Sequence, residues 1–255
     1  MPAIVFDFDG TLTYDSPNIW KRLWKDLGYS TGTGSYFSCL FIQFMLGKID
    51  HKEWCDLSCE EFMKKGLSKQ HIKPIVDEIK LIDGIQETFK TLHDNGFSIH
   101  IVSGNFKDVI RTVLGENAKY CSSINGNEFV YDKDGKVKGI IDTKYDFSGK
   151  AEFIKEYMKK HHLNSSEMFF VGNGDNDEWA HKSGCKTICI NPENTDHTDR
   201  VKWKSSIPVC TNLTQILDEI PQIKHRQPTR HKTYGTALMV RPSIQPQALK
   251  NTREK

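Results

Sequence analysis

The feature that most constrains the fold is a short run near the N-terminus, Ala3-Ile4-Val5-Phe6-Asp7-Phe8-Asp9-Gly10. Its first half is apolar, β-branched and aromatic, which is typical of a strand buried on both faces of a parallel sheet. Because side chains alternate along a strand, Asp7 and Asp9 point to the same side at its C-terminal end. Ligands bind at that edge of open α/β sheets, and Gly10 lets the backbone approach a ligand closely. Two acids there repel each other unless a cation such as Mg²⁺ or a shared proton intervenes.

Strand and helix patterns alternate through the second part of the chain. Further strands are predicted at residues 97–103, 168–172 and 186–191, and helices at residues 86–95, 107–114, 150–161 and 177–183. A β-hairpin is expected over residues 127–141, where Asp132-Lys133-Asp134-Gly135 separates two apolar runs. The alternation indicates an α/β fold with a Rossmann-like, doubly wound parallel sheet.

Two stretches depart from this alternation. Residues 14–82 are too long for a loop and read as several aromatic-rich helices, so we expect a helical cap domain inserted after the first strand. The core domain then comprises residues 1–13 and 83–221. Residues 222–255 contain few large apolar side chains, and we expect a basic, flexible tail there.

Charge and cysteine content limit the partners and the compartment. The formal charge is +2, and the tail holds eight Lys or Arg against one acid, which leaves −5 for residues 1–221. An acidic body gives no reason to expect nucleic acid, although the tail can make weak contact with an anionic membrane. Seven cysteines, an odd number, and no secretory-type apolar region favour reduced thiols and a cytoplasmic location. Nothing in the sequence defines the oligomeric state.

Three later segments carry polar residues at the same predicted edge. Ser103 and Gly104 come at the end of a strand, so that backbone N–H groups and a hydroxyl can cradle an oxyanion, although Ser103 read alone is better explained as an ordinary N-terminal helix cap. Lys150 opens a helix, where a cation opposes the helix dipole unless an anion offsets it. Asn173 to Asp177 follow another apolar strand and offer oxygen ligands, as would an ordinary turn.

The order of these segments resembles the four motifs of the haloacid dehalogenase superfamily, namely DxDGT, Ser-Gly, Lys, and a Gly-Asn-Gly-x-x-Asp loop. The sequence is most similar to the branch that contains phosphoserine-phosphatase-like enzymes. The resemblance covers roughly residues 1–220 and includes the helical insert, the hairpin and the string Lys150-Ala151-Glu152. Four motifs in the right order are far more specific than any one of them.

The resemblance implies a phosphatase that works through an aspartyl phosphate. Asp7 would attack phosphorus, and Asp9 would protonate the leaving group and then activate water. The transferring phosphoryl group would be held by Thr11, Ser103, Lys150 and the Gly104 backbone.

The resemblance also implies a Mg²⁺ site formed by the Asp7 carboxylate, the Asp9 backbone carbonyl and Asn173, with Asp177 behind these ligands. The family ordinarily has Asp at position 173, and the amide of Asn173 still ligates magnesium but without charge. We therefore predict weaker Mg²⁺ affinity than in typical relatives. Two alternatives are that Asp175 moves in as a ligand, or that the chain is a catalytically reduced binding module.

The substrate is expected to be a small phosphorylated metabolite or a phosphorylated protein. Free phosphoserine is disfavoured, because the family grips it with a cap Glu and a cap Arg, and the nearest positions here are Ser16 and the Cys55-Asp56 region. An aromatic phosphoester such as phosphotyrosine, or a phosphocholine-type cation over Trp20, Trp24 or Trp54, is an alternative. The simpler interpretation is that these aromatic residues form the core of the insert.

Two non-enzymatic functions remain as alternatives. A phosphoryl-accepting receiver domain also presents acids and a lysine at a sheet edge, but the long insert and the DxDGT string disfavour it. A lipid-binding adaptor would use the basic tail and a vestigial body. Within the superfamily, nothing points to a base suited to dehalogenase or phosphonatase chemistry, so phosphoester hydrolysis is the favoured function.

Overall fold

The computed structural model describes residues 1–14 and 18–223 of the chain. They form one compact unit, within which seven strands make a single sheet in the order β4-β3-β2-β1-β5-β6-β7. The strands are β1 (Ala3–Phe6), β2 (Ser98–Phe106), β3 (Cys121–Tyr131), β4 (Val137–Ile141), β5 (Met168–Gly172), β6 (Lys186–Ile190) and β7 (Ser205–Ile207). Ser16 and almost all of the predicted tail lie outside the described residues.

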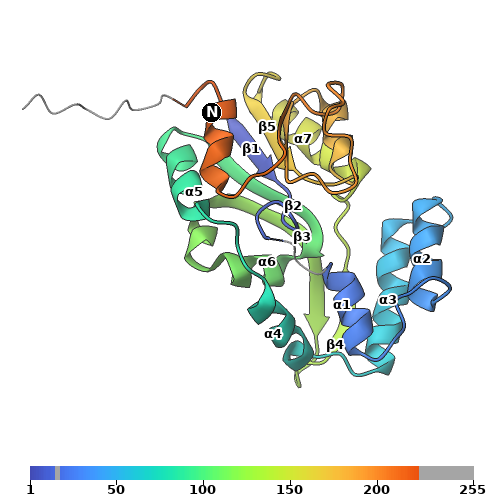
Figure 1. The fold of residues 1–255 in the computed structure, drawn as a ribbon. Helices are drawn as coiled ribbons and strands as arrows, with labels where there is room; N and C mark the ends of the chain where they lie inside the picture. Colours follow the sequence, from blue (N-terminus) through green and yellow to red (C-terminus); the bar gives the residue numbers. More distant parts are fainter. Residues whose placement is uncertain (15–17, 224–255) are drawn as a thin grey trace, which may run out of the picture. The chain divides into compact units, whose positions relative to one another are not determined.

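The first strand lies in the middle of the sheet, as a fully apolar sequence predicts. Strand β1 pairs in parallel with β2 on one side and with β5 on the other (Figure 1). Its side chains alternate between two hydrophobic clusters, with Ile4 and Phe6 in one and Ala3 and Val5 in the other. Both faces of β1 are therefore covered, which confirms the doubly wound α/β fold.

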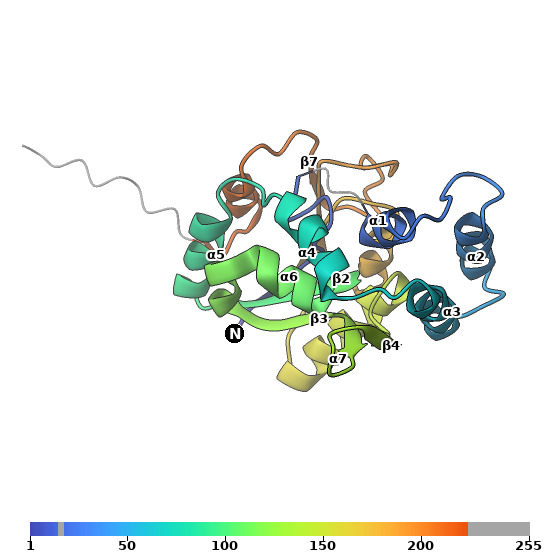
Figure 2. The ribbon, with the colours of Figure 1, turned by 90° about the horizontal axis from the view of Figure 1, so that it is seen from below.

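Helices cover both faces of this sheet. The α-helices are α1 (Ile19–Asp26), α2 (Tyr36–Met45), α3 (His51–Lys64), α4 (Lys69–Glu78), α5 (Ile85–Asp94), α6 (Lys107–Leu114) and α7 (Ser148–His161). Three 3₁₀-helices are η1 (Gly115–Tyr120), η2 (Glu178–Ser183) and η3 (Leu213–Glu219). Figure 2 shows α5 and α6 on one side of the sheet and α7 on the other. Among the described residues, no helix has the length and apolar character needed to cross a bilayer.

Helices α1 to α4 lie between β1 and α5 in the chain. Polar N-caps begin three of them, because the side chains of Asn18, Ser35 and Asp50 each accept a backbone N–H bond from the first helical turn. Trp24 is fully buried among these helices, with its ring 5.5 Å from that of Phe62. The helical insert thus has an aromatic core, whereas the domain boundaries at residues 14 and 82 stay a prediction.

The structure corrects two of the sequence-based expectations. The predicted hairpin exists, but its first strand, β3, begins at Cys121 and joins the main sheet by pairing in parallel with β2. The missed residues include the polar Ser122, Ser123 and Asn125, and Ser123 bonds His100 of β2 at 2.8 Å. The helix predicted at residues 177–183 is present over Glu178–Ser183, but as the short 3₁₀-helix η2 and not a full α-helix, and it ends at Gly184 in the left-handed conformation.

Candidate active site

The turn after β1 brings the two N-terminal acids to the carboxyl end of the sheet. Asp7 is still tied to the sheet, since its backbone N–H donates to the Val171 carbonyl at 3.0 Å, and Gly10 then reverses the chain with φ of 71°. A Cβ atom at Gly10 would lie 2.3 Å from the Asn173 amide nitrogen. Glycine is therefore required both by conformation and by the close approach of the loop after β5.

A buried lysine joins this turn to the loop after β5. Lys150 of α7 is 0% exposed and donates to Asp7 Oδ1 at 2.8 Å and to Asp177 Oδ1 at 2.5 Å. The other oxygen of Asp177 accepts the backbone N–H groups of Asn173 at 2.9 Å and Gly174 at 3.0 Å. The chain thus holds three charged groups from distant segments in one buried network.

The negative charges of this network are only partly compensated. Burial, and next the charge of Asp177, raise the pKa of Asp7 well above its usual value, while Lys150 opposes the shift. Burial raises the pKa of Asp9 to about 6. Burial alone would lower the pKa of Lys150, but the carboxylates of Asp177 and Asp7 outweigh it and raise that pKa. Three carboxylates thus face one ammonium group.

An asparagine that the sequence analysis missed holds the second acid. Asn105 is 1% exposed, and its Nδ2 donates to both oxygens of Asp9, at 3.0 and 3.1 Å. Its own Oδ1 accepts the Phe106 backbone N–H at 2.6 Å, which fixes the amide orientation. An amide side chain directly after the Ser-Gly motif, at the carboxyl end of a strand, was the signal that could have revealed it.

Ser103 and Gly104 lie on the wall of the site, but not as helix caps. The N-cap of α6 is Phe106, so the capping interpretation of Ser103 is wrong, and its Oγ accepts the Asn105 backbone N–H at 3.3 Å. The Gly104 carbonyl accepts two bonds, from Trp20 Nε1 at 3.0 Å and Asn127 Nδ2 at 2.8 Å. The Trp20 bond links helix α1 to the Ser103-Gly104 segment of β2.

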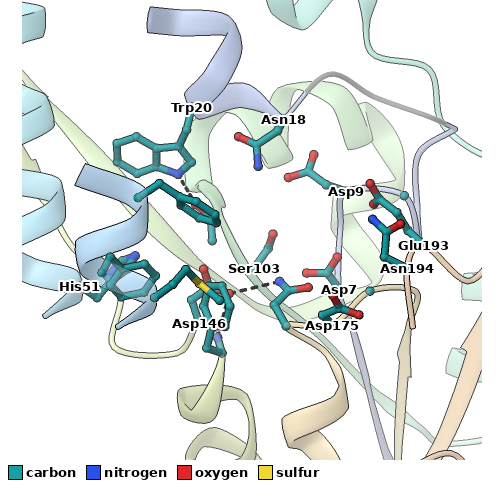
Figure 3. A pocket seen from close by; sticks show the side chains of 18 of the residues that line it. Asp7, Asp9, Asn18, Trp20, His51, Ser103, Asp146, Asp175, Glu193 and Asn194 are labelled. Atoms are coloured by element: carbon teal, nitrogen blue, oxygen red, sulfur yellow. Dashed lines mark hydrogen bonds between the residues drawn. The ribbon is translucent and has the colours of Figure 1, made fainter. Parts of the chain in front are cut away.

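These groups surround a pocket of about 510 Å³ (Figure 3). Of the residues predicted from the sequence, six line it: Asp7, Asp9, Ser103, Gly104, Asn173 and Asp175. Three others, Thr11, Lys150 and Asp177, are 0% exposed and lie behind the wall. Thr11 there donates from Oγ1 to Asn173 Oδ1 at 3.2 Å.

The pocket has an acidic side and an aromatic side. Its carboxylates are Asp7, Asp9, Asp146, Asp175 and Glu193, and its aromatic rings are Trp20, Phe37, Phe41, Phe44, Trp54 and Phe147. In Figure 3, Asp7, Asp9 and Asp175 lie on one side, opposite Trp20 and His51. Within the described part of the chain, no Lys or Arg lines the pocket. A phosphate dianion entering it therefore needs an added cation.

The residues at the acidic side fit a magnesium ion. Among residues 1–14 and 18–223, no group of three His, Cys, Asp or Glu side chains is arranged to hold a metal ion. Asn173, which lines the pocket with Asp7 and Asp9, offers an amide oxygen instead of a carboxylate. Oxygen donors from Asp7, Asp9 and Asn173, together with the uncompensated negative charge, are nonetheless the donor set that a hard cation favours.

Curated proteins of similar sequence are phosphoserine phosphatases. The chain is 30% identical over 182 residues to the phosphoserine phosphatase of Archaeoglobus fulgidus, an alignment that covers 68% of this chain and 48% of that protein. It is 29% identical to the phosphoserine phosphatase of Lactococcus lactis, covering 68% of this chain and 76% of the relative. The chain thus spans about half the length of the first of these relatives and three quarters of the second.

Solved structures show the same fold. A phospho-aspartyl intermediate analogue of phosphoserine phosphatase superposes with a TM-score of 0.65 at 21% identity, covering 86% of this chain and 98% of that chain. A substrate-bound complex of phosphoserine phosphatase gives the same TM-score and coverage at 19% identity. A family model described as haloacid dehalogenase-like hydrolase matches residues 4–178, and the chain belongs to this family, on its phosphoserine-phosphatase-like side.

Proposed function

We propose that this protein is a Mg²⁺-dependent phosphatase that hydrolyses a phosphomonoester through an aspartyl phosphate on Asp7. One observation carries the proposal: Asp7 and Asp9 line the same pocket as Ser103 and Gly104, while the buried ammonium of Lys150 donates to Asp7. In this proposal, one cavity is lined by the nucleophile Asp7, the acid Asp9 and the phosphate-binding residues Ser103 and Gly104.

The two acids divide the reaction between them in this proposal. Asp7 forms a bond to phosphorus as the ester P–O bond breaks, and the alcohol leaves with a proton from Asp9. Water activated by Asp9 then hydrolyses the aspartyl phosphate and releases inorganic phosphate. Asn105 positions Asp9 for both steps, because it bonds both carboxylate oxygens.

The remaining polar groups hold the phosphoryl group and its charge. Ser103 and Gly104 line the pocket and would offer a hydroxyl and a backbone N–H, while Lys150 and Thr11 act from behind the wall through Asp7 and Asn173. Mg²⁺, held by Asp7, the Asp9 carbonyl and Asn173, would supply the positive charge that the phosphoryl oxygens require. We expect its affinity to be reduced by the neutral ligand at position 173.

Helices α1 to α4 act as a cap over the pocket in this proposal, because α1, α2 and α3 contribute rings to its wall. The relatives are named phosphoserine phosphatases, but we propose another phosphoester for this chain. A substrate with a free carboxylate needs a basic partner, and no Lys or Arg among the described residues lines the pocket. The seven cysteines, none of which forms a disulfide, support a reducing compartment such as the cytoplasm.

Turnover of p-nitrophenyl phosphate with and without Mg²⁺ tests the function. We expect many equivalents of product per protein in the presence of Mg²⁺, and background rates in EDTA or with Asp7→Asn. The matched control is Asp134→Asn, which makes the same change at an exposed position of the β3–β4 turn and should retain the wild-type rate. A single equivalent of released p-nitrophenol would instead indicate a phosphoryl-accepting switch, and an active Asp7→Asn variant would refute the assigned nucleophile.

A further inference from the structure

The side of the pocket opposite the acids is a continuous aromatic wall. The Trp54 ring is at its centre, with the centroids of Phe37, Phe41 and Phe44 at 5.8, 6.0 and 6.2 Å and that of Trp20 at 5.9 Å. These rings come from three helices, α1, α2 and α3. The wall is therefore built by packing the whole helical insert together.

This wall is distinct from the core of the insert. Trp24 and Phe62 are fully buried and do not line the pocket, so the interpretation as core holds for them. Phe41, by contrast, is 42% exposed although it contacts Trp54. Aromatic surface left open on the wall of a concave pocket is typical of a ligand site rather than of a folding core.

Phe147 extends the wall from the opposite side at a conformational cost. It precedes α7 with φ of 47° and ψ of −119°, a strained region that non-glycine residues rarely occupy. Its ring lies 5.4 Å from that of Phe44, in an edge-to-face arrangement. The Phe147 side chain thus lines the pocket from a backbone conformation of the kind that clusters at functional sites.

The carboxylate of Asp146 lies between Phe147 of the aromatic wall and the Ser103-Gly104 segment of β2. Asp146 Oδ1 accepts the Phe147 backbone N–H at 2.9 Å and the Asn176 side-chain amide at 3.4 Å. A Cβ atom at Gly104 would lie 2.3 Å from Asp146 Oδ2, so this acid is next to the Ser103-Gly104 segment. A substrate whose phosphate lies at Ser103 and Gly104 would therefore have its leaving group beside Asp146.

The charges near the leaving group favour a cation. Asp7 and Asp9 are assigned to phosphoryl and metal chemistry, but Asp146, next to Phe147 of the wall, lines the pocket in addition to them. The one imidazole of the pocket, His51, packs against Phe44 at 5.9 Å and lies far from Asp7 in Figure 3. A leaving group with a carboxylate meets like charge here, whereas an organic cation meets both a carboxylate and aromatic faces.

We infer that the substrate is the phosphomonoester of a small organic cation, with a quaternary ammonium group or a cationic ring on a short linker. The cation lies against the wall formed by Phe44, Trp54 and Phe147, with Asp146 beside the linker, while the phosphate reaches Asp7. This inference rests on the proposed phosphatase function and names the substrate class of the same site.

A matched pair of substrates isolates the effect of the positive charge. Phosphocholine and 3,3-dimethylbutyl phosphate have the same shape, but the second has carbon in place of nitrogen and no positive charge. We expect kcat/KM to be about tenfold higher for phosphocholine, as cation–π contacts and a nearby carboxylate predict. Phosphoserine should be at least about tenfold poorer than phosphocholine, because its carboxylate faces Asp146.

Two variants connect this preference to the wall. Phe44→Leu and Asp146→Asn should each reduce the ratio of kcat/KM for phosphocholine over its neutral isostere by about threefold or more. The control Tyr36→Leu removes an exposed ring of α2 that does not line the pocket, and it should leave the ratio unchanged. Calorimetric titration of Asp7→Asn with the two substrates gives the same comparison without turnover.

The outcomes separate this inference from the proposed function. Failure to hydrolyse p-nitrophenyl phosphate and methyl phosphate would refute the phosphatase proposal itself. Hydrolysis of both, together with equal kcat/KM for phosphocholine and its isostere or with a preference for phosphoserine, would overturn the cationic substrate alone. A preference for the cation that survives both Phe44→Leu and Asp146→Asn would show that another surface recognises it, and would overturn the assignment to this wall.

Discussion

Replacing the buried Lys150 by Met tests the charge network on which the site depends. The substitution keeps an unbranched side chain, one atom shorter, but removes the ammonium group that bonds Asp7 at 2.8 Å and Asp177 at 2.5 Å. All three side chains are at most 4% exposed, so water cannot take over the role of the lysine. Two buried carboxylates then remain without a cationic partner.

The expected loss of stability is large. Removing one partner of a buried ion pair costs about 3–5 kcal/mol, because an uncompensated charge stays in a low-dielectric environment. In a protein of this size each kcal/mol shifts Tm by roughly 2–4 °C, so Lys150→Met should lower Tm by about 6–20 °C. The measurement is made in EDTA, because a bound divalent cation would neutralise part of the carboxylate charge that has lost its lysine partner.

A double-mutant cycle with Asp177→Asn identifies the cause. The amide can still accept the backbone N–H groups of Asn173 and Gly174, and one of the two unpaired charges is gone, so the double variant should be more stable than Lys150→Met alone. Lys155→Met, at an exposed position of the same helix, should change stability by less than about 0.5 kcal/mol. A loss below about 1 kcal/mol for Lys150→Met, or simple additivity in the cycle, would refute the reasoning.

Three further predictions follow from other contacts. Burial lowers the pKa of His100 to about 4, so the unfolded chain binds more protons between that value and its usual pKa of about 6.5. The free energy of unfolding should therefore fall by about 3 kcal/mol as pH drops through this window, a slope that urea titrations should find reduced in His100→Gln. Trp20→Phe removes the N–H donor to the Gly104 carbonyl but keeps an aromatic ring. It should lower kcat several-fold and change the free energy of unfolding by about 1 kcal/mol. An unchanged kcat would argue against a catalytic role for the contact between Trp20 and Gly104. Asn173→Asp should lower the half-saturating Mg²⁺ concentration, measured by activity titration, and should destabilise the metal-free protein beside Asp7; an unchanged Mg²⁺ dependence would contradict our view of this ligand.

The central part of the fold could be predicted because its signals are local. An apolar run that ends in alternating acids defines β1, and parallel strands bring their carboxyl ends to one edge, which is why Asp7, Ser103 and Asn173 converge. The first half of β3 gave no such signal, because its polar residues pair with β2 through backbone bonds and through contacts such as Ser123 with His100.

The leaving-group side of the pocket could not be predicted, because it depends on tertiary contacts between segments without periodicity. Asp146 and Phe147 lie in the connection before α7, and a left-handed phenylalanine is a conformation that sequence rules exclude. The aromatic stripe of residues 20–62 was visible, but only packing divides it into core and wall. Trp24 is fully buried away from the pocket, whereas Trp54, although only 4% exposed, lines it.

The distribution of negative charge connects the metal site with the substrate. Relative to the family pattern, Asn173 removes one carboxylate at the phosphoryl end of the pocket, while Asp146 adds one beside Phe147, where the leaving group is proposed to lie. Asp146 lowers the affinity for an anionic leaving group relative to a cationic one, because its charge is outside the proposed Mg²⁺ ligand set. The two features also act on different quantities. Asn173→Asp should change the dependence on Mg²⁺ but not the preference for a cation, and Asp146→Asn should change the preference but not the dependence, so a variant that altered both would show that metal and leaving group share one electrostatic site.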